Sequence, residues 1–240
     1  MHSSFLDPGT FDQWALLPAG KDGDRGGLAT VHDLWPGIDS GREKPVFDHP
    51  KTVAEYLAFE RVSDAKHEYV DGFIYAMAGA SDDHVSIVGN LTAAFVVQLR
   101  GKKCRSYSSD MALAKDAEKA DFSKGTFYYP DVVVTCSDRD RGSRIKKDPV
   151  LVVEVLSEGT EKLDQTEKLE TYRATPTLQQ YWLVHQGQKR IVVHSRGPGG
   201  WTSEEMTSGR LRVELPGGAL EVSVDEIYEE VLGLEHRSDS

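Results

Sequence analysis

The sequence predicts an α/β fold in which a mixed β-sheet is flanked by helices. Short apolar runs, most continuous at residues 132–134 and 150–153, are typical of strands that are buried on both faces. Segments with an apolar residue every three or four positions alternate with these runs and predict helices. The chain has 240 residues, which is enough for one such domain with its own core.

The beginning of the chain differs in composition from the rest. Residues 1–50 hold 7 of the 22 glycines and 5 of the 10 prolines, and no sustained hydrophobic period runs through them. We therefore predict an irregular N-terminal extension at 1–50, one domain at 51–232 and a polar tail at 233–240.

Local signals place the predicted helices. Capping boxes, in which Ser or Thr is followed three residues later by Glu, predict helix starts at Thr52 and Ser223. Apolar residues at helical spacing predict a long helix at 81–100, which Gly101 ends. Composition predicts one more helix at 161–173.

Turn signals and apolar runs place the predicted strands. An Asp71-Gly72 turn between two strand-like runs predicts a β-hairpin at 67–77. A second hairpin is expected at 180–194 around Gln186-Gly187. The remaining predicted strands cover residues 104–113, 127–135, 150–156, 211–215 and 219–222.

The charge of the chain limits its partners. The formal net charge is -11, from 39 acidic and 28 basic residues, which argues against electrostatic binding of nucleic acid over the whole surface. Any contact with nucleic acid must therefore be local. No uncharged apolar run approaches the ~18 to 20 residues of a membrane helix, and the first residues do not resemble a signal peptide. We expect a cytoplasmic protein with no membrane partner.

The chain contains two cysteines, Cys104 and Cys136. Their spacing indicates neither a zinc site nor the disulfide framework of a secreted protein. We interpret both as small buried hydrophobic residues in a reducing compartment.

Two carboxylates stand where strands are predicted to be buried. Glu154 interrupts the apolar run at 150–156, where a lone charge is costly unless it is paired or bound to a metal. Asp131 follows Pro130 at the start of the run at 132–134, so neighbouring strands could hold both carboxylates over one ion. Such oxygen ligands suit Mg²⁺ or Mn²⁺, which polarise phosphoryl oxygens and activate water. The matching reaction is hydrolysis of a phosphodiester.

Four segments occur in the order that is typical of one protein family. They are residues 66–72 (Lys-His-Glu-Tyr-Val-Asp-Gly), 129–131 (Tyr-Pro-Asp), 154–157 (Glu-Val-Leu-Ser) and the stretch from Asp164 through Lys168 to Tyr172. In these segments the chain resembles the Uma-two family of putative restriction endonucleases, part of the PD-(D/E)xK nuclease superfamily. The resemblance covers roughly residues 51 to 231 and implies a restriction-endonuclease-like fold.

The resemblance also implies roles for individual residues. Asp131 and Glu154 are expected to bind Mg²⁺, the Val155 carbonyl to add a ligand, and Glu68 to complete an acidic pocket. The superfamily pattern has a lysine two residues after the glutamate, but this chain has Leu156 there. The usual charge stabiliser of the attacking water is therefore missing from that strand.

Lys168 is the best replacement for the missing lysine. A helix lysine commonly takes this role in the family, and a helix after the strand could direct its side chain back to the pocket. Lys162, Lys146 and Lys147 are weaker candidates.

The proposed ligands also have purely structural interpretations. Glu154 could form a buried ion pair with Lys168, and Asp131 could cap a turn after Pro130. Glu68 is as compatible with the solvated face of a hairpin as with a pocket.

Three other features also have both a structural and a functional interpretation. Lys168 could pair with Asp164 on a helix surface. His84 lies on the apolar side of the helix at 81–100, so it is more typical of a core histidine than of a base, although it could point into the pocket. The basic residues of 139–147 form either a solvated loop or a phosphate-contacting lip.

We therefore predict a Mg²⁺-dependent endonuclease, with Mn²⁺ as a substitute metal, that hydrolyses phosphodiester bonds and prefers DNA. The alternative is a catalytically inactive nuclease-fold module for nucleic-acid binding or oligomerisation, which the missing strand lysine and the acidic charge permit. A homodimer is compatible with both. A third reading is a hydrolase of another phosphate ester.

Overall fold

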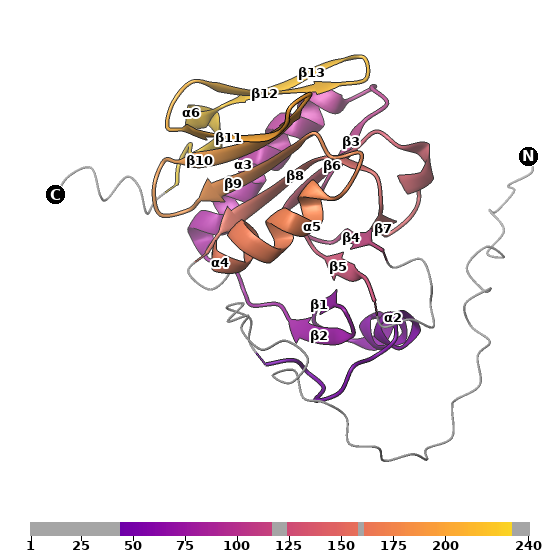
Figure 1. Cartoon of the computed structure of the whole chain (residues 1–240). Coiled ribbons are helices and arrows are strands. Elements are labelled where there is room, and N and C mark those ends of the chain that lie inside the picture. Colours follow the sequence, from indigo (N-terminus) through magenta and orange to yellow (C-terminus); the bar gives the residue numbers. More distant parts are fainter. Residues whose placement is uncertain (1–43, 117–123, 158–160, 232–240) are drawn as a thin grey trace, which may run out of the picture.

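Figure 1 shows the computed structural model of the chain, in which residues 44–116, 124–157 and 161–231 are described. The predicted polar tail and most of the predicted N-terminal extension lie outside these ranges, so both stay predictions. The described ranges form three β-sheets with helices packed on them. The fold belongs to the mixed α/β class, as the sequence predicted.

The central sheet has six strands in the order β11-β10-β9-β8-β6-β3. Strands β8 and β9 run parallel and all other neighbours run antiparallel, so the sheet is mixed. Every residue of β6 and β8 is buried, which confirms that these apolar runs are central strands. The strands are β3 (Arg105–Ser108), β6 (Val132–Thr135), β8 (Pro149–Leu156), β9 (Gln180–His185), β10 (Ile191–Gly197) and β11 (Gly200–Met206).

A second sheet has the order β2-β1-β5-β4-β7. The predicted hairpin joins β1 to β2 through Asp71 and Gly72, whose φ values of 44° and 100° are the positive ones that a two-residue turn requires. Helix α2 (Val53–Val62) starts with the predicted capping box and packs on this sheet. The strands are β1 (His67–Val70), β2 (Phe73–Ala76), β4 (Ala112–Lys115), β5 (Thr126–Tyr128) and β7 (Ile145–Lys146).

Both faces of the central sheet are covered (Figure 1). One face packs against the long helix α3 (Asp82–Leu99), the antiparallel pair formed by the predicted strands β12 (Arg210–Leu215) and β13 (Gly218–Ser223), and the short helix α6 (Val224–Ile227). The other face packs against a helix formed by α4 (Glu161–Leu163), the π-helical segment η3 (Asp164–Lys168) and α5 (Leu169–Arg173). A short 3-10 turn, η2 (Asp138–Asp140), follows β6.

Strand β8 illustrates how the two faces are separated. Val153 and Val155 belong to the core on the α3 side, whereas Val152 and Leu156 belong to the core on the α5 side. Since side chains alternate along a strand, Glu154 points to the α5 side. Its partners must therefore come from that helix or from the second sheet.

Two predicted strands are each divided in two. The predicted strand at 104–113 forms β3 and β4, and the one at 127–135 forms β5 and β6, with each half in a different sheet. Pro130 has no N–H for a strand ladder, and Ser109 has a φ of 31° that a strand does not tolerate. The Ser109 N–H donates to the Asp131 carbonyl over 3.1 Å, so both breaks occur at the same place.

The predicted helix at 161–173 is not a regular α-helix. Its middle turn, η3, is π-helical, whereas composition indicated one continuous α-helix. Such wide turns are rare and frequently occur at functional sites. Among the described residues, no helix is long and apolar enough to cross a membrane.

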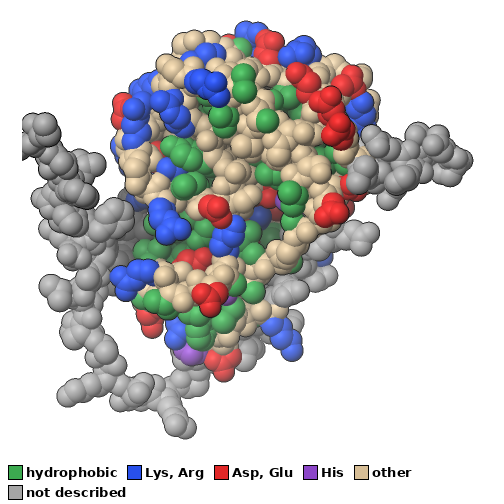
Figure 2. All heavy atoms as spheres, turned by 180° about the vertical axis from the view of Figure 1, so that it is seen from behind, with side chains coloured by type: hydrophobic (Ala, Val, Ile, Leu, Met, Phe, Trp, Pro, Cys, Tyr) green, Lys and Arg blue, Asp and Glu red, His purple; other side chains and the backbone are tan. Residues whose placement is uncertain are grey.

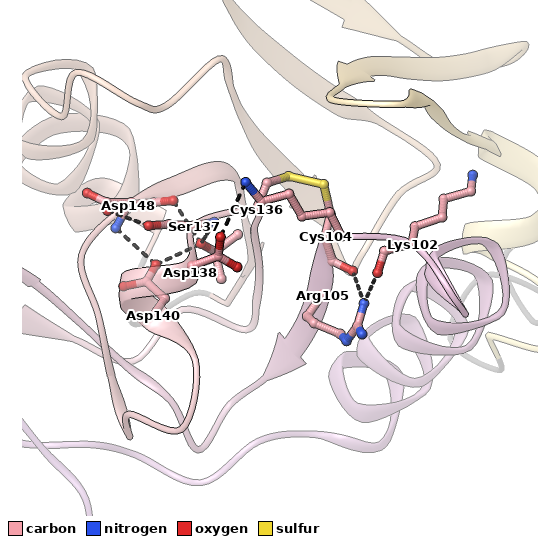
Figure 3. Close-up of a disulfide and its surroundings, with 10 residues drawn as sticks. Lys102, Cys104, Arg105, Cys136, Ser137, Asp138, Asp140 and Asp148 are labelled. Carbon is pink, nitrogen blue, oxygen red and sulfur yellow. Dashed lines mark hydrogen bonds and ion pairs between the residues drawn. A yellow bond between two sulfur atoms is a disulfide. The ribbon is translucent and has the colours of Figure 1, made fainter.

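The two cysteines are buried as predicted, but they are bonded to each other (Figure 3). Cys104 precedes β3 and Cys136 follows β6, and these strands pair in antiparallel register through Arg105 and Thr135. The pairing therefore brings the two residues opposite each other, although they are 32 positions apart in sequence. The interpretation of both as free thiols is wrong, and they no longer indicate a reducing compartment.

Breaking this disulfide is expected to lower the stability of the protein. A cross-link over a loop of this length typically contributes about 2 to 4 kcal/mol. Urea unfolding with and without a thiol reductant measures the difference, and the Cys104→Ala/Cys136→Ala double variant should not respond to reductant. Two reactive thiols in denatured, non-reduced wild-type protein would show that the bond is absent.

Candidate active site

The candidate site lies where the chain crosses between the two larger sheets. Strand β5 ends at Tyr128 in one sheet, and β6 begins at Val132 in the other, so the connection carries Asp131 to the junction. Strand β8 lies directly beside β6, with Val153 opposite Val132. Glu154 is therefore one position beyond the paired part of the two strands, next to Asp131.

Asp131 and Glu154 interact through each other's backbone. The Asp131 Oδ2 atom accepts a hydrogen bond of 2.7 Å from the Val155 N–H, and the Glu154 Oε2 atom accepts a longer one of 3.4 Å from the Asp131 N–H. The N–H and C=O groups of one strand residue point to the same side, so the Val155 carbonyl also faces the Asp131 side of β8. The three groups that the sequence selected as metal ligands lie together.

Lys168 lies among three carboxylates. Its Nζ atom is 3.1 Å from Glu68 Oε1, 3.2 Å from Glu154 Oε1 and 3.0 Å from Asp164 Oδ1. The lysine side chain is 6% exposed, so it faces the interior and not the solvent. These carboxylates come from β1, β8 and η3, and the contact with Lys168 ties the two larger sheets to the helix.

Lys168 ends the π-helical turn η3 and faces the interior. Asp164, Lys168 and Tyr172 are four residues apart, and all three are buried on the side of the helix that faces the central sheet. The ion pair with Asp164 that the sequence allowed as a surface contact is formed, but it is buried.

The site carries more negative than positive charge. Burial raises the pKa of the Glu154 carboxyl well above its usual value, and the charges of Asp164, Asp131 and Glu68 raise it further, against the opposing effect of Lys168. Burial alone lowers the pKa of Lys168, but the surrounding carboxylates outweigh it, and this pKa lies well above its usual value. Lys168 is thus held as a cation among acids that repel one another.

Tyrosines form the wall of the site. The Tyr172 hydroxyl donates a hydrogen bond of 3.0 Å to Glu154 Oε1, and burial together with the charge of Glu154 raises the pKa of that hydroxyl well above its usual value. The Lys168 Nζ atom lies 5.5 Å from the centre of the Tyr128 ring. The Tyr181 hydroxyl donates to the Asp164 carbonyl over 3.1 Å. These rings exclude water from one side of the charged cluster.

His84 occupies a position that the sequence did not favour. It was interpreted mainly as a core histidine, but its Nε2 atom lies 2.9 Å from Asp131 Oδ1, and both side chains are 16% exposed. His84 lies in the first turn of α3, whose N-cap Ser81 accepts a hydrogen bond from the His84 N–H. The helix start therefore fixes the ring beside the carboxylate.

The other candidate lysines lie elsewhere. Lys162 is exposed on α4. The Lys146 Nζ atom is buried and donates to the carbonyls of Asp140 and Ser143, and the Lys147 N–H donates to Asp140 Oδ1. The Lys146 Nζ atom also lies 4.0 Å from the centre of the Tyr107 ring on β3, so neither lysine is described in contact with Asp131 or Glu154.

The donor chemistry of the site fits a hard divalent cation. No group of three His, Cys, Asp or Glu side chains within the described ranges is arranged to hold a metal ion. Mg²⁺, however, is usually held by one or two carboxylates together with waters and substrate phosphates. Asp131, Glu154 and the Val155 carbonyl provide such a set, and the surplus of negative charge favours a cation.

The fold is similar to that of one solved structure. The crystal structure of "a putative nuclease belonging to DUF820" from Anabaena variabilis ATCC 29413 superimposes with a TM-score of 0.59 at 16% identity, covering 76% of this chain and 100% of that chain. At this identity the match shows a shared fold.

Sequence comparison gives the family. The profile of the Uma2 family, described as "Putative restriction endonuclease", matches residues 53–225. Two uncharacterized proteins of Synechocystis are similar as well: slr1290 is 38% identical over 176 residues, 72% of this chain and 89% of that protein. The second, sll1609, is 29% identical over 168 residues, 68% of this chain and 91% of that protein. The chain belongs to the Uma2 family, which confirms the resemblance found in the sequence.

Replacing Lys168 with Met is expected to destabilise the fold strongly. Removing one partner of a buried ion pair typically costs about 3 to 5 kcal/mol, because the remaining charges stay buried without compensation. Chemical unfolding measures the loss, and adding Glu68→Gln to the variant should recover part of it. Lys162→Met, on the exposed side of the same helix, is the matched control. Equal effects of the two lysine substitutions would contradict the described cluster.

Proposed function

We propose that the protein is a Mg²⁺-dependent endonuclease that hydrolyses phosphodiester bonds in DNA. The observation that carries this proposal is the pair of Asp131 and Glu154 on neighbouring chain segments, with the buried cation Lys168 bonded to the glutamate. Membership in the Uma2 family, described as "Putative restriction endonuclease", and the similarity to a solved "putative nuclease" support the general reaction class. Mn²⁺ is expected to replace Mg²⁺, because both prefer oxygen ligands.

In this proposal the two carboxylates and the Val155 carbonyl hold the metal. Bound Mg²⁺ supplies a Lewis acid that polarises a phosphoryl oxygen and lowers the pKa of water. Lys168 orients the attacking water and offsets negative charge that develops on the phosphate. Glu68 and Asp164 hold the Lys168 ammonium in place, since each lies within 3.1 Å of it.

Lys168 thus takes the role of the lysine that Leu156 replaces. Leu156 is buried in the core on the α5 side and cannot supply a charge. Lys168 approaches the same glutamate from the helix that covers this face. In this proposal the helix lysine supplies the charge that the strand does not.

A polyanionic substrate requires local positive charge near the site. The Lys66 Nζ atom donates a hydrogen bond of 3.0 Å to the Ser109 carbonyl, and the Ser109 N–H donates one to the Asp131 carbonyl. The Lys66 ammonium, aided by Arg144, lowers the pKa of Asp110 in the same loop. Figure 2 shows a hollow between the large body and the small lobe, with basic and acidic side chains on its walls. A phosphate backbone is proposed to enter there despite the acidic net charge.

The basic residues at 139–147 provide less unpaired positive charge for a phosphate than their number indicates. Arg141 pairs with Asp138 at 2.9 Å, and Arg139 approaches Asp148 at 3.7 Å. Lys146 is buried. Arg144 and Lys147 are exposed, and Arg144 also acts on Asp110 in the loop beside Asp131. Arg144 is therefore the better candidate in this stretch for contact with phosphate, and its removal should reduce the salt dependence of DNA binding.

Metal-dependent cleavage tests the proposed function. Wild-type protein with Mg²⁺ or Mn²⁺ is expected to cut duplex or single-stranded DNA, and a chelator should abolish the activity. Asp131→Asn and Glu154→Gln should each reduce the rate at least about 100-fold, because even the outer-sphere partners of metal ligands typically contribute 10- to 100-fold. Glu170→Gln, exposed on α5, is the matched control.

The alternative is a nuclease-fold module that binds nucleic acid without cutting it. The replacement of the strand lysine by Leu156 is the observation that favours it. DNA binding without cleavage, with any of several divalent ions and substrates, would support this alternative and contradict the proposed function. Cleavage of small phosphate esters but not of DNA would identify the protein as another phosphate-ester hydrolase.

His84 is proposed to position Asp131 for the metal. Its Nε2 atom contacts Asp131 Oδ1, so its loss frees the carboxylate to rotate. His84→Ala should weaken Mn²⁺ binding about 10- to 100-fold in calorimetry, as is typical of outer-shell partners. His84→Gln, which retains a hydrogen-bond donor, should recover part of the affinity. A merely structural role predicts lower stability with unchanged Mn²⁺ affinity in both variants.

A further inference from the structure

The outer face of α3 is apolar and open to solvent. Val85, Val96 and Val97 are 58%, 42% and 65% exposed, and they are among the few large hydrophobic side chains exposed in the described part of the chain. Together with Gly89 and Ala93 they line a groove beside β3. Figure 2 looks onto this side of the molecule and shows hydrophobic side chains over the middle of the large body. We call this surface the α3 face.

The sequence of α3 is unusual for a surface helix. The fifteen residues from 85 to 99 contain no charged residue, in a chain of which 28% is charged. Its inner face packs in the core through Ile87, Leu91 and Phe95, which accounts for the apolar residues there. The exposed valines are not members of the hydrophobic cores of the described residues. Surface that lacks charge and exposes large apolar side chains is typical of the centre of a protein interface.

The open edge of the central sheet lies beside the same face. Strand β3 is the last strand of that sheet, and no other described strand pairs with its second edge. Ser106 and Ser108 of β3 line grooves along α3, so the edge and the helix face form one continuous surface. An unpaired edge presents free backbone donors and acceptors to another chain.

Four residues of the α3 face are arranged symmetrically along the helix, whereas Val96 has Ser86 as its symmetric counterpart. Val85 and Val97 are equally far from position 91, and so are Gly89 and Ala93. In a two-fold interface, if one residue contacts a second residue of the partner, the second residue also contacts the first of the partner. An antiparallel pair of α3 helices centred on position 91 would therefore place Val85 of each copy against Val97 of the other. The small residues at the centre would let the two helices approach closely, and a Cβ atom at Gly89 meets nothing within 4 Å in this chain.

The charges at the ends of α3 follow the same symmetry. Asp82 begins the helix and Arg100 follows its last residue, and these two positions are also equally far from position 91. Lys102 and Lys103 add to the basic end. An antiparallel pair would bring the acidic end of each helix to the basic end of the other, with the helix dipoles opposed.

From these observations we infer that the α3 face binds a second copy of this chain in a two-fold symmetric dimer, with the two α3 helices antiparallel. The self-complementary spacing of valines, small residues and end charges selects a second copy over an unrelated partner. Antiparallel pairing of the two β3 edges can share the same two-fold axis, because identical edge strands that pair about such an axis run antiparallel. This inference does not depend on the proposed catalysis.

Sedimentation equilibrium of the full chain tests the dimer. Wild-type protein is expected at about twice the monomer mass of 26.6 kDa. Val97→Glu should raise the dimer dissociation constant at least tenfold, because two charges would be buried at the axis-related valines. Val62→Glu is the matched control, since Val62 is 75% exposed on α2, away from the α3 face. Circular dichroism checks that each variant is folded.

A charge exchange tests the antiparallel geometry. Asp82→Lys and Arg100→Glu should each weaken the dimer, whereas the double variant should restore the wild-type dissociation constant. A monomeric wild-type protein at all concentrations would overturn the inference, and so would an unchanged dimer in the folded Val97→Glu variant. Failure of the double variant to recover would overturn the antiparallel arrangement.

Discussion

The buried contact of Lys168 with Glu68, Glu154 and Asp164 is the interaction on which the site depends. Each acid comes from a different element, and without the lysine their charges would repel one another inside the protein. With it, the first hairpin, the central sheet and the helix on its face are held in one arrangement. The same contact keeps a cation beside the carboxylates that are proposed to bind metal.

The position of the site follows from how the chain connects its two larger sheets. Strand β3 ends and strand β6 begins where the chain passes from one sheet to the other, and the hydrogen bond between the Ser109 N–H and the Asp131 carbonyl joins the two crossings. At this crossing the Asp131 carboxylate contacts His84 and the Val155 N–H, which places it beside Glu154. The disulfide between Cys104 and Cys136 closes the other end of the same strand pair. One end of β6 is thus covalently fixed, and the opposite end carries the site.

Much of the fold could be predicted because its signals are local. The capping boxes at Thr52 and Ser223, the Asp71-Gly72 turn and the apolar run around Glu154 each depend on a few adjacent residues. Strand β11 was not predicted, because its polar residues are mostly exposed and lack an apolar alternation.

Other features depend on residues far apart in sequence. The alignment of β3 with β6 determines the strand breaks at Ser109 and Pro130 and the pairing of the two cysteines. This alignment cannot be predicted from a few adjacent residues. The place of Glu154 in an apolar strand was visible in the sequence, but Lys168 was selected only through resemblance to a family. The contact of His84 with Asp131 requires the start of α3 to lie beside the start of β6, so the sequence could not assign it.

A crystal soaked in Mn²⁺ tests the central claim most directly. An anomalous difference peak is expected within coordination distance of the Asp131 and Glu154 carboxylates, with Lys168 beside the glutamate. The absence of such a peak from the map of a Mn²⁺-soaked crystal would contradict the proposed metal site. So would carboxylates of Asp131 and Glu154 that point away from each other.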